Sequence, residues 1–298
     1  APALCGANGR YIEMDYQETL IYGDVMAMGK RKWEDFALDV AIGGSINDKN
    51  VNSTRYDSKN ASLKYANVFN LANIVMNGSA SIDQKIDSRR QLQSVFGTAQ
   101  VGYQDKVFLD LTARNDWAST LAYTSHEKSG FFYPSAGLSF LIDKWIQLPE
   151  WISFAKLRGT YSKVGNDIPQ FITNSVSHIT AGGELQANDA APFKEMEPEM
   201  THSVEVGTEW RFFQSRLGFN LTYYRTNTHN QFFKLPALAG DMYAYRYVNA
   251  GDIQNRGWEL TVDATPVLTP DFTWKTSLNF SSNRNKIKEL HEVLNELV

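Results

Sequence analysis

The sequence predicts an all-β protein, an antiparallel up-and-down transmembrane β-barrel that is partial, with about ten strands of a larger barrel and long loops on one rim. Residues 96–117 alternate apolar and polar side chains on both sides of a short polar break, which is typical of a hairpin with one face toward an apolar medium. Its arms, 92–103 and 106–117, approach the roughly 9–11 residues with which a tilted strand crosses a bilayer. Short and long connections also alternate along the chain.

Runs of period two predict each strand in turn. The strands fall at 18–29, 34–45, 92–103, 106–117, 131–143, 152–164, 202–212, 216–227, 256–266 and 271–283. The short connections are 30–33, 103–106, 144–151, 213–215 and 267–270, and the long ones are 46–91, 118–130, 165–201 and 228–255. An up-and-down sheet gives this alternation when turns occupy one rim and loops the other, as in outer-membrane barrels, whereas a Greek-key sandwich seldom does.

Each predicted strand has one apolar and one polar face. In the second hairpin arm Val107, Leu109 and Leu111 share a face, while Asp110 and Thr112 point the other way. Further apolar rows are formed by Phe36, Leu38, Val40 and Ile42, by Ala136, Leu138, Phe140 and Ile142, by Leu217, Phe219, Leu221 and Tyr223, and by Trp258, Leu260, Val262 and Ala264. The opposite faces are polar, as at Ser203, Glu205, Glu209 and Arg211. A water-filled or plugged lumen accommodates such charges, and a dry sandwich core does not.

Large aromatic residues gather at the predicted strand ends. They are Tyr103, Trp117, Phe131, Phe132, Tyr133, Trp145, Trp151, Phe212 and Phe213. We expect them to form girdles at the two membrane interfaces, because an indole or phenol ring combines an apolar body with a polar tip. The alternative is that aromatic residues simply favour strands.

Composition excludes several classes of protein. The formal net charge of −4 and the lack of interleaved basic and aromatic residues argue against nucleic-acid binding. The mean hydropathy of −0.37, without a run of about 18 apolar residues, excludes a helical membrane span. The single cysteine, Cys5, has no partner for a disulfide or a metal site. The first residues lack the pattern of an export signal, so we expect either a protein that is not exported or a piece of a longer chain.

Four ordered blocks resemble a known family. They are 94–120 (SVFGTAQVGYQDKVFLDLTARNDWAST), 130–143 (GFFYPSAGLSFLID), 154–167 (FAKLRGTYSKVGND) and 249–260 (NAGDIQNRGWEL). With the loop-like segment 63–74, they resemble the barrel region of SusC/RagA-like TonB-dependent outer-membrane transporters, and the resemblance covers about 19–290. We interpret residues 103–106 as a tight turn, and Gly257 as a position with unusual backbone angles where a strand begins again.

Complete members of that family carry an export signal, an amino-terminal plug, a TonB-contacting box and a closed barrel of about 22 strands. The resemblance therefore implies that residues 1–298 form a partial TonB-dependent receptor β-barrel domain, without signal peptide, plug or remaining strands, ending in a helix-like or loop-like tail from Ile287. It implies an outer-membrane importer of oligosaccharides or peptides. The implied partners are a SusD-like surface lipoprotein, the TonB complex through the missing amino-terminal region, and the lipid bilayer, with no cofactor and no nucleic acid.

Candidate chemistry is sparse. The histidines, His126, His178, His202, His229 and His291, lie far apart in sequence, nearly all in predicted loops, and without metal-ligand spacing. Glycosidase carboxylates could come from either of two groups: the segment of Lys194, Glu195, Glu197 and Glu199, or the pair Glu205 and Glu209 on one strand face. Nothing indicates an apolar setting for either group. Oxygen ligands for calcium could come from 47–50 or 165–167, for which turn chemistry is the preferred interpretation.

The long loops are the best predicted binding surface. The segments 165–201 and 228–255 contain Phe171, Phe193, Phe232, Phe233, Tyr243, Tyr245 and Tyr247, which could stack on sugars, bind apolar peptide side chains or pack loop against loop. No single residue is assigned as a catalytic, metal, cofactor or ligand contact. The alternative to the importer is a soluble β-rich carbohydrate-binding or adhesin domain, in which the apolar rows would be buried between two sheets. An enzyme would need two carboxylates converging in one cleft.

Overall fold

The computed structural model describes residues 6–76, 81–128, 130–173, 176–179, 185–193, 195–237 and 240–289. Ten strands form one antiparallel sheet in which every strand pairs with its neighbours in chain order. They are β1 (Ile12–Trp33), β2 (Phe36–Asp57), β3 (Ser81–Tyr103), β4 (Val107–Ala118), β5 (Phe131–Leu141), β6 (Ile152–Asn166), β9 (Glu199–Phe212), β10 (Leu217–Pro236), β11 (Tyr245–Leu268) and β12 (Thr273–Glu289). A two-stranded sheet, β7 (His178–Ile179) with β8 (Leu185–Gln186), lies in the connection between β6 and β9.

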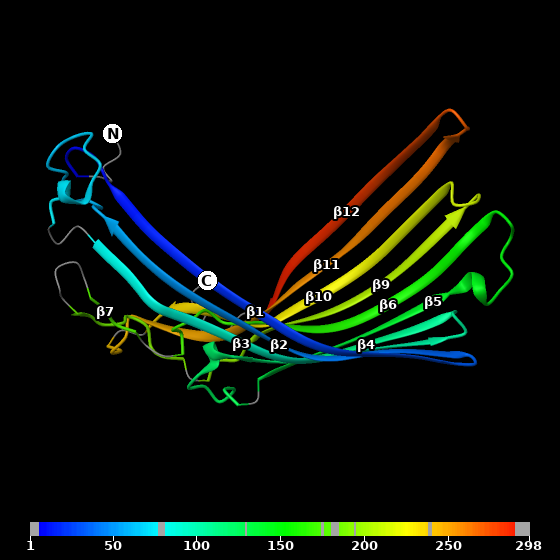
Figure 1. Ribbon diagram of the computed structural model, residues 1–298, viewed down its shortest axis with the longest axis horizontal. Helices are drawn as coiled ribbons and strands as arrows, with labels where there is room; N and C mark the ends of the chain where they lie inside the picture. Colours follow the sequence, from blue (N-terminus) through cyan, green and yellow to red (C-terminus); the bar gives the residue numbers. More distant parts are fainter. Residues whose placement is uncertain are drawn as a thin grey trace.

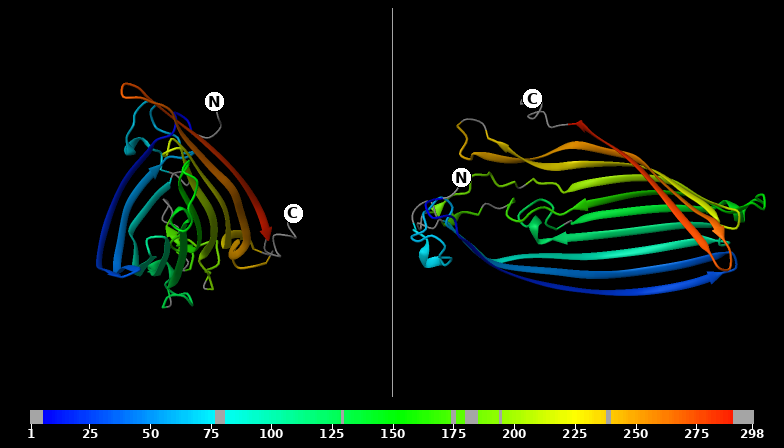
Figure 2. Two further views of the ribbon diagram at one scale, coloured as in Figure 1. Left: turned by 90° about the vertical axis from the view of Figure 1, so that its right-hand side faces the viewer. Right: turned by 90° about the horizontal axis from the view of Figure 1, so that it is seen from above.

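The sheet is strongly twisted and curves into an open trough, as Figure 1 and the end view in Figure 2 show. Most connections on one side, at the right of Figure 1, are short turns, and most of those at the other end are longer. The predicted alternation of short and long connections fails at two places: 142–151 on the turn side has ten residues, and 237–244 at the other end has only eight. None of the helices in the described residues, all single 3-10 turns at 71–73, 119–121 and 142–144, is long and apolar enough to cross a membrane.

Several strands are much longer than the sequence patterns predict. Residues 46–57 and 81–91, expected in a loop, continue β2 and β3, and most of 228–255 belongs to β10 and β11, which leaves only 237–244 between them. The run 47–50 is therefore strand and not turn, and Ile287 continues β12 instead of opening a tail, whose residues from 290 lie outside the described part. Strands of 22–24 residues exceed what a bilayer requires, so β1, β2, β3 and β11 extend well beyond it.

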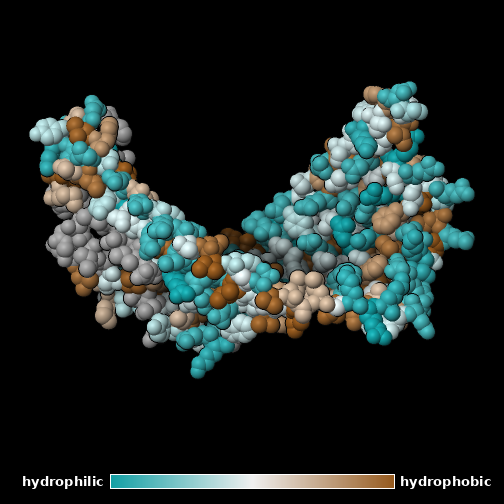
Figure 3. Space-filling view, in the orientation of Figure 1, coloured by the Kyte–Doolittle hydropathy of each residue, from teal (hydrophilic) through white to brown (hydrophobic). Residues whose placement is uncertain are grey.

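One row of cross-strand partners traverses all ten strands. Its members, from β1 to β12, are Trp33, Phe36, Tyr103, Val107, Phe140, Leu157, Thr208, Leu221, Leu260 and Phe280. Every member except Thr208 is apolar or aromatic, because register and the two-residue period bring the predicted apolar faces together. We call the face that carries this row the outward face and its opposite the inward face. Figure 3 shows brown apolar groups gathered over the middle of the sheet.

The turn side of the sheet carries aromatic clusters. Tyr103 lies 5.0 Å from Phe36 and 6.5 Å from Trp145 between ring centroids, and Trp151 stacks on Phe212 at 5.6 Å. The predicted tight turn is present: the Lys106 N–H donates to the Tyr103 carbonyl oxygen at 2.9 Å, and residues 104 and 105 have positive φ angles of 50° and 54°. The turn end of the sheet is thus edged by rings suited to a membrane interface.

Two interpretations of local residues were wrong. Phe131 and Tyr133, expected in a girdle, pack instead in a core on the inward face. Gly257 does not begin a strand with unusual backbone angles, since it lies inside β11 and has no positive φ. Its constraint is close approach: a Cβ there would stand 2.2 Å from the carbonyl oxygen of Ser282.

Candidate functional site

The two faces of the sheet differ in chemistry. On the outward face large apolar side chains are exposed, for example Ile42 (60% exposed) and Leu278 (66% exposed). The inward face carries polar and charged side chains that bond to one another across strands. Such a wall, apolar outside and polar inside, separates hydrocarbon from a wet lumen, and the inward face is therefore the surface that a solute would meet.

On β2 to β5 the inward wall is a mixed polar surface. Gln100 donates to Asp110 across β3 and β4 at 2.6 Å, and the hydroxyls of Thr112 and Ser135 are 2.5 Å apart across β4 and β5. A shallow depression of about 330 Å³ lies over this part of the wall, lined by residues that include Lys30, Asp39, Thr98, Gln100, Asp110 and Thr112. Its donors and acceptors are those of a surface that can hydrogen-bond a polar solute.

On β6 to β10 the inward wall is organised by Arg158. Its Nη2 donates to Asn220 at 3.0 Å and to Thr222 at 2.6 Å, two strands away. The guanidinium crosses the intervening strand above Gly207, where a Cβ would stand 2.8 Å from Arg158 Nε. The glycine therefore makes room for a cation that lies flat along the wall.

Loops fold against the inward face near the long-loop rim. A buried core joins Leu121, Phe131, Ile168, Ile172 and Met196, and Phe193, Phe232 and Tyr247 pack on it. Most of the aromatic residues predicted on loops are therefore not free binding groups. Phe232, Phe233, Tyr245 and Tyr247 belong to strands, while Phe171 is 54% exposed on the loop after β6.

Asn249 fixes the end of the 187–198 segment to the wall. Its Oδ1 accepts from the backbone N–H of Glu197, and its Nδ2 donates to the backbone carbonyl oxygens of Glu197 and Asn230, each at 2.8 Å. The Glu197 carboxylate accepts in turn from Asn230 Nδ2 at 2.6 Å. One side chain thus satisfies three backbone groups that the loop would otherwise leave to water.

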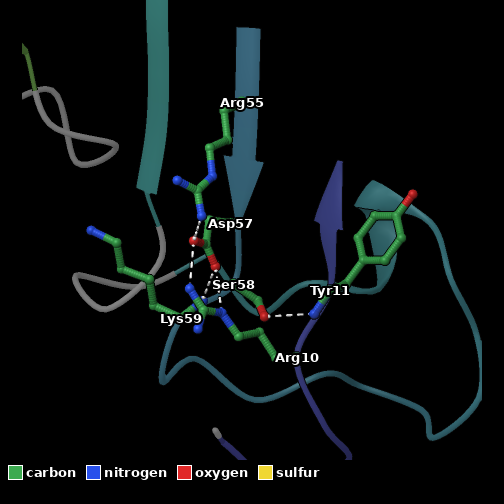
Figure 4. A network of polar contacts seen from close by, with 6 residues as sticks. All are labelled: Arg10, Tyr11, Arg55, Asp57, Ser58 and Lys59. Carbon is green, nitrogen blue, oxygen red and sulfur yellow. Dashed lines mark hydrogen bonds and ion pairs between the residues drawn. The ribbon is translucent and has the colours of Figure 1, made fainter. Parts of the chain in front are cut away.

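The first long connection is anchored by a buried carboxylate at the end of β2, well beyond the apolar band. Asp57, 3% exposed, accepts two bonds from Arg10 at 2.8 and 2.7 Å, one from Arg55 at 2.8 Å and one from the Lys59 backbone N–H at 2.8 Å (Figure 4). The Arg10 guanidinium, with the N–H of Lys59 and the charge of Arg55, holds the pKa of Asp57 at about 2 although burial opposes this shift. The Tyr11 N–H donates to Ser58 Oγ beside it at 3.0 Å.

Sequence patterns do not reveal this anchor, because Arg10 and Asp57 are 47 residues apart and neither falls in a period-two pattern. The only available signal was the concentration of Arg, Asp, Ser and Asn where the apolar alternation stops. Such residues are typical of a chain leaving a sheet.

The predicted carboxylates do not converge. Glu205 and Glu209 share the inward face of β9, but Glu209 pairs with Arg211 at 2.8 Å, and Glu199 accepts from Asn166 at 2.9 Å. Glu195 and Glu197 lie in the loop that Asn249 holds, and Lys194 lies outside the described residues. The geometry contains solvated and paired carboxylates, and it places no two of these side chains about a common cleft.

Two histidines are closer than the sequence suggested. His202 on β9 and His229 on β10 contact each other, with ring centroids 5.6 Å apart, and the Tyr161 hydroxyl lies 2.9 Å from His202 Nδ1. His126 lies in the loop after β4 and His178 in β7, while His291 and Cys5 lie outside the described part. Among the residues that the structure describes, no group of three histidine, cysteine or acidic side chains could hold a metal ion.

The predicted calcium segments have other roles. Asp48 in the 47–50 run bonds to Arg89 on β3 through Nε at 2.9 Å and to Gln91 at 2.8 Å. Asp167 follows the end of β6 and accepts from the N–H of Ile168 at 2.7 Å, and it pairs with Arg90. Both carboxylates fasten strands and loops together.

Comparison with known proteins agrees with this geometry. The family described as TonB dependent receptor-like, beta-barrel, matches residues 6–290. TonB-dependent receptor P26 of Formosa agariphila is 30% identical over 210 residues, which are 67% of this chain and 21% of that protein. TonB-dependent receptor SusC of Bacteroides thetaiotaomicron is 25% identical over 218 residues, 68% of this chain and 21% of that protein. The chain thus spans about a fifth of the length of the curated relatives it matches.

Solved structures share the fold at lower identity. The RagAB peptide importer in its open-open state superposes with a TM-score of 0.78 at 20% identity, covering 96% of this chain and 32% of that chain. The outer membrane transporter YddB from Escherichia coli gives 0.64 at 12% identity, covering 93% and 34%. The apolar outward rows are thus the lipid-facing surface of an outer-membrane barrel and not one half of a soluble sandwich. The chain belongs to the TonB-dependent receptor β-barrel family, a family of transporters and not of enzymes.

Proposed function

We propose that this chain is part of the barrel wall of a SusC/RagA-like importer that takes up oligosaccharides or peptides through the outer membrane with energy delivered by TonB. The observation that carries the proposal is the two-faced wall. A row of cross-strand partners, apolar except for Thr208, runs across all ten strands on the outward face, and hydrogen-bonded polar groups such as Arg158, Asn220 and Thr222 cover the inward face. The likeness to TonB-dependent receptor SusC and to the fold of the RagAB peptide importer supports an importer of this type.

We further propose that residues 1–298 are one portion of the barrel domain, and that plug and remaining strands belong to the same protein. A SusD-like surface lipoprotein would cover the long-loop rim. The rim suits a partner because its loops are fixed in place: Asn249 holds Glu197, and the buried core holds Ile172 and Met196. A preorganised surface loses little conformational entropy when a partner binds.

The experiment uses the complete protein in its native host. Deletion of its gene should abolish uptake of one fluorescent pool, either oligosaccharides or peptides, and complementation should restore it. Dissipating the inner-membrane proton gradient should stop that uptake, as energy through TonB requires. Uptake of both pools that is unchanged by the deletion would reject the proposal, as would uptake that depends on the protein but persists without the gradient.

The partner is tested separately by affinity purification of the complete protein from its native membrane. A stoichiometric surface lipoprotein should remain bound. A variant in which Asn249→Ala releases the rim loop should retain less of it, whereas Asn279→Ala, on the inward face of β12, should retain as much as the unaltered protein. Purification without any lipoprotein would reject the lid.

A further inference from the structure

On the outward face apolar residues give way to polar residues at a boundary, and the position of this boundary shifts from strand to strand. On β2 the last apolar outward residue is Ile46 and Asp48 follows it. On β11 the corresponding change comes between Trp258 and Arg256, where Trp258 lies only two residues from Leu260 of the ten-strand row, whereas Ile46 lies ten residues from Phe36 of the same row. Tilted barrel strands produce such a staircase when the apolar band follows the membrane plane and not the hydrogen-bonding rows. The residues just past this boundary therefore lie at the level of the lipid head groups on the long-loop side.

At this level on β10 to β12 three arginines lie in direct register. Arg225 is the partner of Arg256, and Arg256 is the partner of Arg284. Neighbouring strands are about 4.8 Å apart, and like charges placed directly opposite one another are destabilising. Lys286 and Lys288 extend the same group, and with Arg256, Arg284 and Gln254 they line a recess of about 90 Å³. We call these five cations the basic row.

Within the part of the chain that the structure describes, the basic row is not neutralised. Arg225 donates to neutral acceptors, Asn227 at 3.1 Å and, with the Gln254 amide oxygen turned toward it, Gln254 at 2.8 and 2.9 Å. Among the described residues, the other four cations have no ion pair or side-chain hydrogen bond. The nearest outward carboxylate, Asp252, lies farther from the apolar band, accepts from Asn227 at 2.9 and 3.0 Å and is 3.9 Å from His229 Nδ1. Glu289 is its partner on β12.

We propose that the basic row binds the phosphate groups of a phosphorylated lipid in the outer leaflet. Phosphate oxygens between adjacent guanidinium groups would offset the repulsion between these cations and accept charge-assisted hydrogen bonds from them. The occupant is a lipid and not a free anion because the row lies on the lipid-facing side. Arg256 precedes Trp258 by two residues, about 7 Å along the strand, so acyl chains can lie on the apolar band while the head group meets the cations. This inference rests on the barrel's place in the membrane and not on the solute it carries.

The experiment compares matched variants of the complete protein in detergent. The row variant combines Arg256→Gln with Lys286→Gln, and the control combines Arg211→Gln with Lys275→Gln, which removes one arginine and one lysine from the inward face near the turn ends of β9 and β12. Native mass spectrometry measures binding of diphosphorylated lipid A, of the same lipid without phosphates, and of inorganic phosphate alone.

The row variant should bind diphosphorylated lipid A at least about tenfold more weakly, as expected for loss of charge-assisted bonds, and the control should bind it unchanged. A third variant, Arg256→Lys with Lys286→Arg, keeps both charges and should keep most of the affinity, which separates binding from misfolding. Equal weakening in the control, equal binding of the phosphate-free lipid, or displacement of the lipid by inorganic phosphate at equal concentration would overturn the proposal.

Discussion

Tyr224 and Gly257 are direct partners across β10 and β11, and the tyrosine occupies the space into which a side chain at position 257 would project. A Cβ at this glycine would stand 2.7 Å from the Tyr224 hydroxyl oxygen and 2.2 Å from the carbonyl oxygen of Ser282. The second contact is with backbone, which cannot move aside without breaking the β11–β12 ladder. The absence of a side chain is therefore a packing requirement of three adjacent strands.

Gly257→Ala should destabilise the complete protein by about 1–3 kcal/mol, the range expected for overpacking, because both obstructing groups are fixed. Thermal unfolding in detergent, followed by the gel mobility of folded and unfolded forms, measures the change. Gly97→Ala is the control, since Gly97 lies on β3 inside the sheet and a Cβ there comes no closer than 3.6 Å to a neighbouring strand. Equal melting temperatures for the two variants would contradict this account.

The apolar outward row gives a second prediction. Val262→Arg should lower the yield of folded protein in the membrane, because an arginine near the middle of the lipid face costs about 2–4 kcal/mol. Thr261→Arg changes the adjacent residue on the inward face and should leave the yield nearly unaltered. Outer-membrane fractions of the two variants, compared by immunoblot, test this; a greater loss with Thr261→Arg would reverse our assignment of the faces.

Asp57 gives a pH-dependent prediction. Its pKa is held at about 2, below the ordinary value of 3.8, so its stabilisation is complete above pH 4 and is lost as the pH falls through about 2. Asp57→Asn removes the charge at every pH and should loosen the first long connection at neutral pH, by about 1–3 kcal/mol. Hydrogen exchange of the 58–76 amides measures both effects. At pH 7 these amides should exchange faster in Asp57→Asn than in the unaltered protein, and in the unaltered protein they should be less protected at pH 3 than at pH 7.

The control for this prediction is Asp39→Asn. That residue pairs with Lys30 at 3.3 Å, but its side chain is 43% exposed, so the pair contributes little. Exchange in 58–76 should match the unaltered protein. If Asp57→Asn also leaves those amides protected at pH 7, the anchor does not hold the connection.

Asn249 gives a prediction about the rim alone. Asn249→Ala leaves the Glu197 N–H, the Glu197 carbonyl and the Asn230 carbonyl without their partner, so exchange at 195–199 should rise severalfold while the β6–β9 ladder stays protected. Asn279→Ala is the matched control, because Asn279 accepts from Thr261 on the inward wall, far along the sheet from this loop. Unchanged exchange at 195–199 would show that the buried core alone fixes the segment.

Much of the membrane-crossing part could be predicted from sequence. Alternation in Phe36, Leu38 and Val40, or in Leu217, Phe219 and Leu221, marks strands whose two faces meet different media, and the order of all ten followed from it. The strand extensions could not be found in the same way. Where β2 continues as Asn47, Asp48 and Lys49, both faces are polar and the period-two signal disappears although the hydrogen-bond ladder goes on.

Contacts that depend on the register between strands could not be predicted from the sequence either. His202 and His229 meet as diagonal neighbours, because the register of β9 on β10 pairs His202 with Asn227, two residues from His229. The alignment of Arg225, Arg256 and Arg284 has the same origin. The core of Leu121, Ile172 and Met196 joins two loops, and loop packing follows no period that a single sequence displays.

The extension of β10 and β11 past the apolar band has a consequence for how such a protein can diversify. Only residues 237–244 connect them at the tip, and everything below is held by backbone hydrogen bonds that do not depend on side-chain identity. Insertions or exchanges at the tip can therefore alter what the mouth contacts without rebuilding the wall beneath it. A receptor of this design can acquire a new preference through a few surface residues while its height, curvature and membrane seal are inherited unchanged.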